Sequence, residues 1–83
     1  MTETRNELDD AQEGLSRIED AILRLLGRNP RGLRNSEIAE KLQLRSHFNG
    51  KQKDYLTYSV LGGLLSKGEV AWDQRMKVFT KIR

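Results

Sequence analysis

The sequence predicts a small α+β domain that is mainly helical, with three helices followed by a β-hairpin. Apolar residues recur at helical spacing in three separate stretches before Gly68, and after it the period changes to the alternation typical of strands. The 83 residues suffice for one domain with a modest core. Cysteine is absent, which excludes disulfides and cysteine-ligated zinc as sources of stability.

The first helix is predicted from Leu8 or Asp9 to Leu26, because an apolar stripe runs along this stretch. The stripe consists of Leu8, Ala11, Leu15, Ile18, Ile22, Leu25 and Leu26. Acidic residues fill its first turns and Arg24 lies in its last turn, as the helix dipole favours. Gly14 weakens the interior, so we expect a firm start only near Leu15. Gly27 is expected to form a left-handed C-terminal cap.

The chain divides into an acidic segment, residues 1–13, and a domain, residues 14–83. The segment is expected either to fray or to extend the first helix. The apolar stripe also fits a heptad repeat, although over fewer than three heptads. The stripe therefore either faces the domain core or pairs with a second copy of the chain, and one part of it can do each.

The second helix is predicted after Leu33, with Asn35 or Ser36 as its N-terminal cap. Its buried side comprises Ile38, Ala39, Leu42 and Leu44. A polar, cationic loop follows, Arg45–Lys53, in which Asn49-Gly50 marks a turn. This loop is longer than the turn of a simple helix-turn-helix pair.

The third helix is predicted from Lys53 or Asp54 to Lys67. At 100° per residue one face gathers Thr57, Val60, Leu61 and Leu64, which we expect to be buried. The opposite face carries Tyr55, Ser59, Gly62 and Ser66, with Tyr58 on the flank. Gly62-Gly63 costs helix stability, so close packing or a close ligand approach is expected there.

The C-terminal hairpin is predicted from two alternating stretches, Glu69–Trp72 and Met76–Ile82, joined at Asp73-Gln74-Arg75. One face is expected to pack on the helices and consists of Val70, Trp72, Val78 and Ile82. The other face is expected to project Lys77, Phe79 and Lys81. An isolated hairpin is marginally stable, so it must lean on the helices.

Charge is distributed unevenly along the chain. Residues 1–20 carry a net charge of −5 and residues 21–83 a net charge of +8, which together give +3. A basic body with an acidic end is typical of a protein whose body meets a polyanion. A solvated surface of uneven charge is the alternative.

The order helix, helix, loop, helix, hairpin resembles a winged helix-turn-helix domain. The likeness is carried by Leu33–Leu42, with its Glu-Ile-Ala-x-x-Leu pattern, and by Val60–Val70, with Leu-x-x-Leu-x-x-x-Gly-x-Val. It covers about residues 15–83 and names no particular family within this broad group. The resemblance implies binding to double-stranded DNA, with the third helix in the major groove and the hairpin, or wing, on the backbone.

The expected function is that of a small DNA-binding module, such as a transcription regulator or an accessory to a DNA-processing system. Its candidate nucleic-acid contacts are Arg45, Lys51, Lys53, Tyr55, Tyr58, Ser59, Arg75 and Lys77. The third helix lacks the Arg, Asn or Gln that most often read bases, which bears on sequence specificity more than on binding. The alternative is a protein-interaction or homodimerisation module, motivated by the N-terminal helix and by outward-facing Leu65 and Phe79.

No enzymatic activity, metal or cofactor is expected from this sequence. His47 is the only histidine, and no nucleophile–base pair or glycine-rich phosphate loop accompanies it. No run approaches the roughly 20 apolar residues of a membrane span, and the acidic start lacks a signal-peptide pattern. We therefore expect a cytoplasmic protein without a membrane partner.

Overall fold

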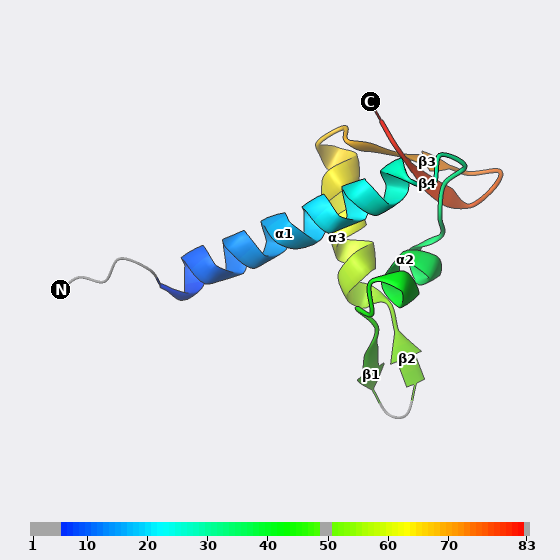
Figure 1. The fold of residues 1–83 in the computed structure, drawn as a ribbon. Helices are drawn as coiled ribbons and strands as arrows, with labels where there is room; N and C mark the ends of the chain where they lie inside the picture. Colours follow the sequence, from blue (N-terminus) through cyan, green and yellow to red (C-terminus); the bar gives the residue numbers. More distant parts are fainter. Residues whose placement is uncertain (1–5, 49–50, 83) are drawn as a thin grey trace.

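A computed structural model describes residues 6–48 and 51–82, and shows a mainly helical α+β domain (Figure 1). Its elements in chain order are α1 (Glu7–Gly27), α2 (Asn35–Lys41), β1 (Ser46–Phe48), β2 (Lys51–Lys53), α3 (Tyr55–Ser66), β3 (Val70–Asp73) and β4 (Val78–Lys81). The three helices and the C-terminal hairpin are those predicted. In the described ranges, no helix has the length and apolarity needed to cross a membrane.

The core lies where α1, α2, α3 and the C-terminal hairpin meet. Its buried side chains include Ile22, Leu26, Leu33, Ile38, Val60, Leu61, Leu64, Val70 and Phe79. The predicted buried face of α3 is confirmed, because Thr57, Val60, Leu61 and Leu64 are all buried. The three apolar side chains of this face, together with Thr57, thus fix how α3 is oriented in the domain.

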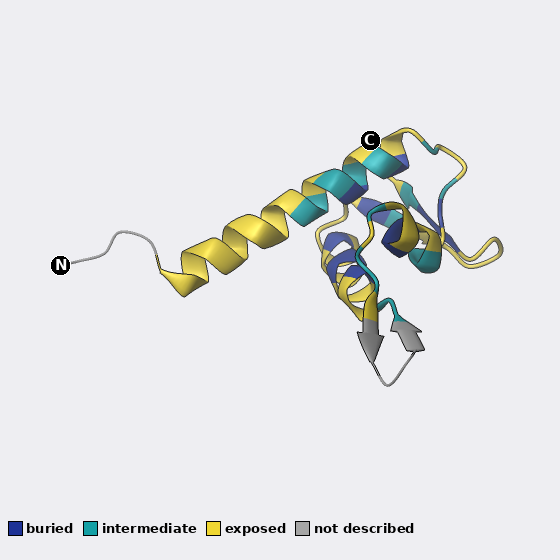
Figure 2. Ribbon diagram, turned by 60° about the horizontal axis from the view of Figure 1, so that its bottom comes forward, coloured by how far each residue is buried: buried dark blue, intermediate teal, exposed yellow. Residues whose placement is uncertain are grey.

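The α1 helix is longer at its start than the sequence indicated. It begins at Glu7, where the Asn6 side-chain oxygen accepts a hydrogen bond from the Asp9 amide at 3.0 Å. The expected firm start near Leu15 is therefore wrong, because this cap and the acidic first turn support the helix despite Gly14. The first half of α1 projects away from the domain with its side chains exposed (Figure 2).

The end of α1 and the start of α2 each differ from the prediction by one residue. Gly27 is still helical and Arg28 is the C-terminal cap in a right-handed conformation, so no left-handed glycine ends α1. The left-handed glycine lies further along the connector, at Gly32, with φ +94°. At α2 the N-terminal cap is Arg34 rather than Asn35 or Ser36, and its amide donates to the Glu37 carboxylate at 2.8 Å.

The stretch Arg45–Lys53, predicted as a loop, contains an antiparallel hairpin of strands β1 and β2, which is the first hairpin in chain order. Its pairs are Ser46 with Lys53, His47 with Gln52 and Phe48 with Lys51. The turn predicted at Asn49-Gly50 lies outside the described residues. The short strands on either side of it were not predicted, although an Asn-Gly pair between two such stretches is a strong hairpin signal.

The C-terminal hairpin turns Phe79, not Trp72, into the core. Phe79 is 5% exposed and Trp72 43% exposed, and the two face each other in register, so the expected facing was wrong. The reason is the register of the hairpin, because directly opposite residues of an antiparallel pair share one face of the sheet. Leu33 exchanges two backbone hydrogen bonds with Phe79, at 3.0 and 2.7 Å, so the connector after α1 pairs along the edge of β4.

The ends of the C-terminal hairpin also differ from the expectation. Met76 and Lys77 belong to the turn rather than to a strand, and Lys77 is left-handed with φ +62°. Ile82, expected to face the helices, is exposed. Val78 and Phe79 are both buried although adjacent, and a Cβ added to Gly32, on the connector along the edge of β4, would lie 2.7 Å from Val78 Cγ2.

Candidate nucleic-acid interface

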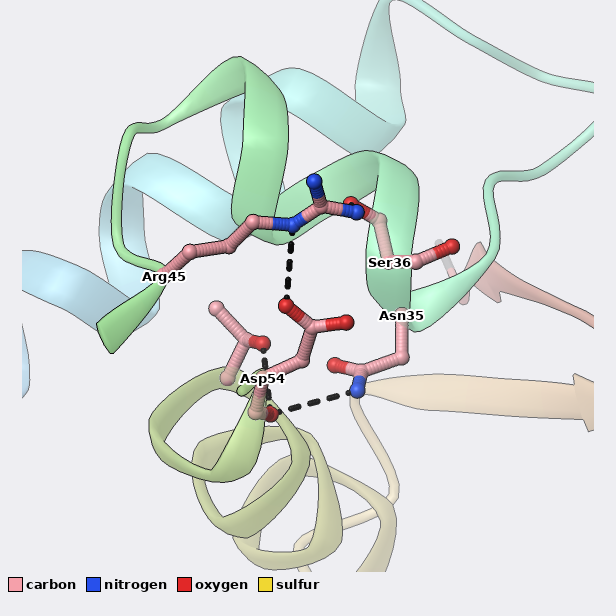
Figure 3. Close-up of polar contacts among 5 residues, drawn as sticks. Asn35, Ser36, Arg45 and Asp54 are labelled. Atoms are coloured by element: carbon pink, nitrogen blue, oxygen red, sulfur yellow. Dashed lines mark hydrogen bonds and ion pairs between the residues drawn. The ribbon is translucent and has the colours of Figure 1, made fainter. Parts of the chain in front are cut away.

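Arg45 joins the first hairpin to the start of α3 (Figure 3). Its Nε donates to Asp54 Oδ1 at 3.0 Å, and its Nη2 donates to the Ser36 carbonyl oxygen at 3.4 Å. The two side chains of the ion pair are 28% and 24% exposed. Of the candidate cations, Arg45 is therefore committed to contacts within the chain.

The carbonyl oxygen of Asp54 gathers a second set of contacts at the same place. It accepts hydrogen bonds from the Tyr58 amide at 3.1 Å, from Thr57 Oγ1 at 3.2 Å and from Asn35 Nδ2 at 3.3 Å. The last of these ties the first residue of α2 to the start of α3 (Figure 3). The position of α3 relative to α2 is thereby fixed by polar contacts as well as by the core.

The outer face of α3 is open to solvent, which the sequence alone had left undecided for Tyr55 and Tyr58. Tyr55 is 69% exposed, Tyr58 is 66% exposed, and Ser59 is also exposed. Lys53 Nζ lies 5.9 Å from the centre of the Tyr55 ring, within reach of a cation–π interaction. The side chain of Lys51, another predicted contact, lies outside the described part of the structure.

The tip of the C-terminal hairpin presents the other two candidate cations. Asp73 Oδ1 accepts from the amides of Arg75 and Met76, at 2.9 and 3.1 Å, and its carbonyl oxygen accepts from the Lys77 amide at 2.7 Å. These bonds shape the turn while the side chains of Arg75 and Lys77 remain exposed. Asp73 thus orders the tip from which both cations project.

The two hairpins lie at opposite ends of α3 (Figure 1). The first leads into its N-terminus with Lys53, and the second follows its C-terminus with Arg75 and Lys77 at the tip. The structure therefore brings Lys53, Tyr55, Tyr58 and Ser59 together along α3 and separates Arg75 and Lys77 from them. A surface of this kind has cations at its ends and hydroxyls and rings between them.

A groove between α3 and the C-terminal hairpin was not foreseen from the sequence. It measures about 420 Å³ and is lined by Asn35, Tyr58, Gly62, Leu65, Trp72 and Phe79. Trp72 was expected in the core, and Asn35 only as a cap. The signal that pointed to this place was Gly62-Gly63 in mid-helix, where a close ligand approach was one of the two expectations.

Groups of three or more His, Asp or Glu side chains arranged to hold a metal ion are absent from residues 6–48 and 51–82. Comparison of the chain with protein-family models, with curated proteins and with solved structures finds no match. The residues and their geometry are therefore the whole basis for a functional proposal.

Proposed function

We propose that the protein is a winged helix-turn-helix module that binds double-stranded DNA, with α3 in the major groove and the β3–β4 hairpin as the wing. The observation that carries the proposal is the exposed outer face of α3, bracketed by two hairpins with cationic residues. Hydroxyls can donate to phosphate oxygens, and Lys and Arg neutralise them. The Leu33–Phe79 bridge supports the proposal because it anchors the hairpin beside the helices.

The salt dependence of binding tests this proposal quantitatively. With Arg45 held by Asp54, the remaining candidate cations are Lys51, Lys53, Arg75 and Lys77. Each phosphate neutralised contributes about −0.9 to the slope of log K against log salt, so the expected slope is about −3 to −4. Anisotropy titrations of a labelled random-sequence duplex at several salt concentrations give this slope.

A pair of charge-matched variants locates the contact. The variant Arg75→Gln/Lys77→Gln is expected to make the slope shallower by about 2, because two phosphate contacts are lost. The variant Arg24→Gln/Arg28→Gln removes the same charge from a separate hollow beside α1 and is expected to leave the slope unchanged. The proposal would be contradicted if the protein did not bind duplex DNA at low salt, or if its affinity did not change with salt concentration.

A second candidate function, homodimerisation through α1, is favoured by the projecting half of that helix. Leu8 is 65% exposed and Leu15 is also exposed, although both lie on the stripe that enters the core further along. A second copy packed along this half of α1 would cover the exposed part of the stripe.

Sedimentation equilibrium at micromolar concentration tests the dimer. The full chain is compared with Leu8→Gln/Leu15→Gln, which keeps helix propensity and removes the exposed apolar side chains. A dimer that becomes a monomer in the variant supports this function. A monomeric full chain at these concentrations eliminates it, and DNA binding is then tested on a monomer.

A further inference from the structure

The groove between α3 and the C-terminal hairpin is apolar and aromatic although it opens to solvent. Tyr58, Leu65 and Trp72 are exposed at its rim, and Phe79 lies at its base. The Trp72 and Phe79 rings are 4.7 Å apart between centres and inclined at 51°. Ligand sites in proteins are typically concave, lined mainly by apolar and aromatic side chains, and about 300–1,000 Å³ in volume.

Gly62 lies in the wall of the groove that α3 forms, and it has no side chain to fill the groove. A Cβ placed on Gly62 would meet nothing within 4 Å, so no packing inside the chain requires glycine at this position. Glycine is disfavoured in a helix interior. Its presence on the groove wall leaves the backbone of α3 directly accessible to an occupant of the groove.

The charges around the groove favour an anionic partner. No carboxylate belongs to its described lining, and Arg34 immediately precedes Asn35 on its edge. The nearby carboxylates of Glu37, Asp54 and Asp73 accept hydrogen bonds from the chain itself. Along the same hairpin, Arg75 and Lys77 lie a few residues beyond Trp72, with exposed side chains.

An occupant that is flat and apolar, and is attached to an anionic backbone, fits these observations together. We infer that the groove holds one unpaired base of a DNA strand, stacked against Trp72 and Tyr58, while the neighbouring phosphates meet the cations. Base–aromatic stacking tolerates any base, since every base has a π-face. That agrees with an α3 surface that lacks the side chains for reading base edges.

This inference rests on the proposed DNA binding and specifies its substrate. A base inside an intact duplex is stacked between its neighbours and cannot enter the groove. DNA that contains an unpaired base is therefore the preferred ligand over a fully paired duplex. The expected preference is at least about fivefold, the lower end of what stacking one base on an aromatic side chain contributes.

Trp72 provides a direct probe, because it is the only tryptophan in the chain. The experiment titrates the full chain with a blunt duplex and with the same duplex carrying one bulged thymine. Anisotropy of the labelled DNA reports binding, and tryptophan emission reports contact in the groove. Tighter binding of the bulged duplex, with quenched emission on that DNA alone, is the expected result.

Adjacent glycines supply the variant and its matched control. Gly62→Leu fills the groove wall, and the ratio of bulged to blunt affinity is expected to fall to about one with no quenching. Gly63→Leu places the same side chain on the next residue of α3, where a Cβ also meets nothing within 4 Å and which does not line the groove. This control is expected to keep both the ratio and the quenching, and circular dichroism confirms that both variants are helical.

The outcomes separate the inference from the function on which it rests. Equal, salt-sensitive binding of both duplexes without quenching would overturn the inference and leave DNA binding intact. The same bulge preference in Gly62→Leu as in the parent would also overturn it, by placing the unpaired base elsewhere. Absence of any anisotropy change on either DNA at low salt would remove the proposed function, and the inference with it.

Discussion

Arg45 and Asp54 form an ion pair at 3.0 Å that closes the base of the β1–β2 hairpin and fixes it to the start of α3. Asp54 is the residue before α3, yet its side chain makes no hydrogen bond to the first turn of the helix. The carboxylate instead accepts a hydrogen bond from Arg45 Nε, while the Asp54 carbonyl oxygen accepts hydrogen bonds from Asn35 Nδ2 and Thr57 Oγ1. One residue therefore links α2, α3 and the hairpin.

Asp54→Ala is expected to lower the free energy of unfolding by about 1–2 kcal/mol, because it removes a charge-assisted hydrogen bond at a site largely shielded from solvent. Asp54→Asn keeps the volume and one neutral acceptor, so its loss should be smaller. Urea denaturation of both variants beside the parent measures the order. Equal stability of the alanine variant and the parent would show that the pair does not hold the hairpin.

The ion pair between Arg45 and Asp54 could not be predicted from the sequence, in which Arg45 is expected to contact a phosphate. Arg45 and Asp54 are nine residues apart, with no periodic pattern to relate them. They come together because the Ser46–Lys53 pair places the flanking residues opposite one another. Without the hairpin register, an arginine in a polar stretch is indistinguishable from a surface cation.

The prediction of buried residues succeeded for α3, where burial follows the helical period, and failed for β4, where two adjacent residues are buried. One face of α3 is covered and the other is open, so the helical period located Thr57, Val60, Leu61 and Leu64. On β4 the adjacent residues Val78 and Phe79 are both buried, and the Gly32–Leu33 segment runs along the edge of the strand. Alternation cannot describe such a strand, and Trp72 was therefore placed inside and Phe79 outside.

Gly32 is a position where the fold requires glycine. It has φ +94°, and an added Cβ would lie 2.7 Å from Val78 Cγ2 and 2.8 Å from the Phe79 carbonyl oxygen. Gly32→Ala combines backbone strain with a clash against backbone, so we expect a loss of at least about 2 kcal/mol. Thermal and urea unfolding measure it.

Gly68→Ala is the matched control for this prediction. Gly68 has φ +76° and a Cβ there would meet nothing within 4 Å, so only the left-handed conformation is penalised, by about 1 kcal/mol. A larger loss of unfolding free energy in Gly68→Ala than in Gly32→Ala would mean that the connector relaxes away from β4. That result would contradict the tight approach between Gly32 and β4.

Lys67 and Glu19 connect the end of α3 to α1, and their hydrogen bond of 2.8 Å raises the pKa of Lys67 above its ordinary value. A raised pKa in the folded state means that the stabilisation is fully present below the ordinary lysine pKa, about 10.4, and is lost as the pH rises through the raised value. The stability difference between the parent and Glu19→Gln should therefore be constant from about pH 7 to 9 and shrink above about pH 10.4.

Urea midpoints of the two proteins across this range measure the difference. Comparing the parent with Glu19→Gln removes the contribution of tyrosines and other lysines that titrate in the same range, because both proteins contain them. A difference that persists undiminished above pH 11 would show that Glu19 stabilises the fold through something other than charged Lys67.

Gly14 lies in the projecting half of α1, where a Cβ would meet nothing within 4 Å. Gly14→Ala is therefore expected to favour the helical state locally by up to about 1 kcal/mol. Because the buried side chains of α1, Ile22 and Leu26, lie more than a turn further along, local fraying there is separate from global unfolding. Helical circular dichroism and amide protection around Gly14 should rise while the urea midpoint stays unchanged in a monomer.

A midpoint that rises with protein concentration would instead couple this half of α1 to the cooperative unit, as dimerisation through Leu8 and Leu15 requires.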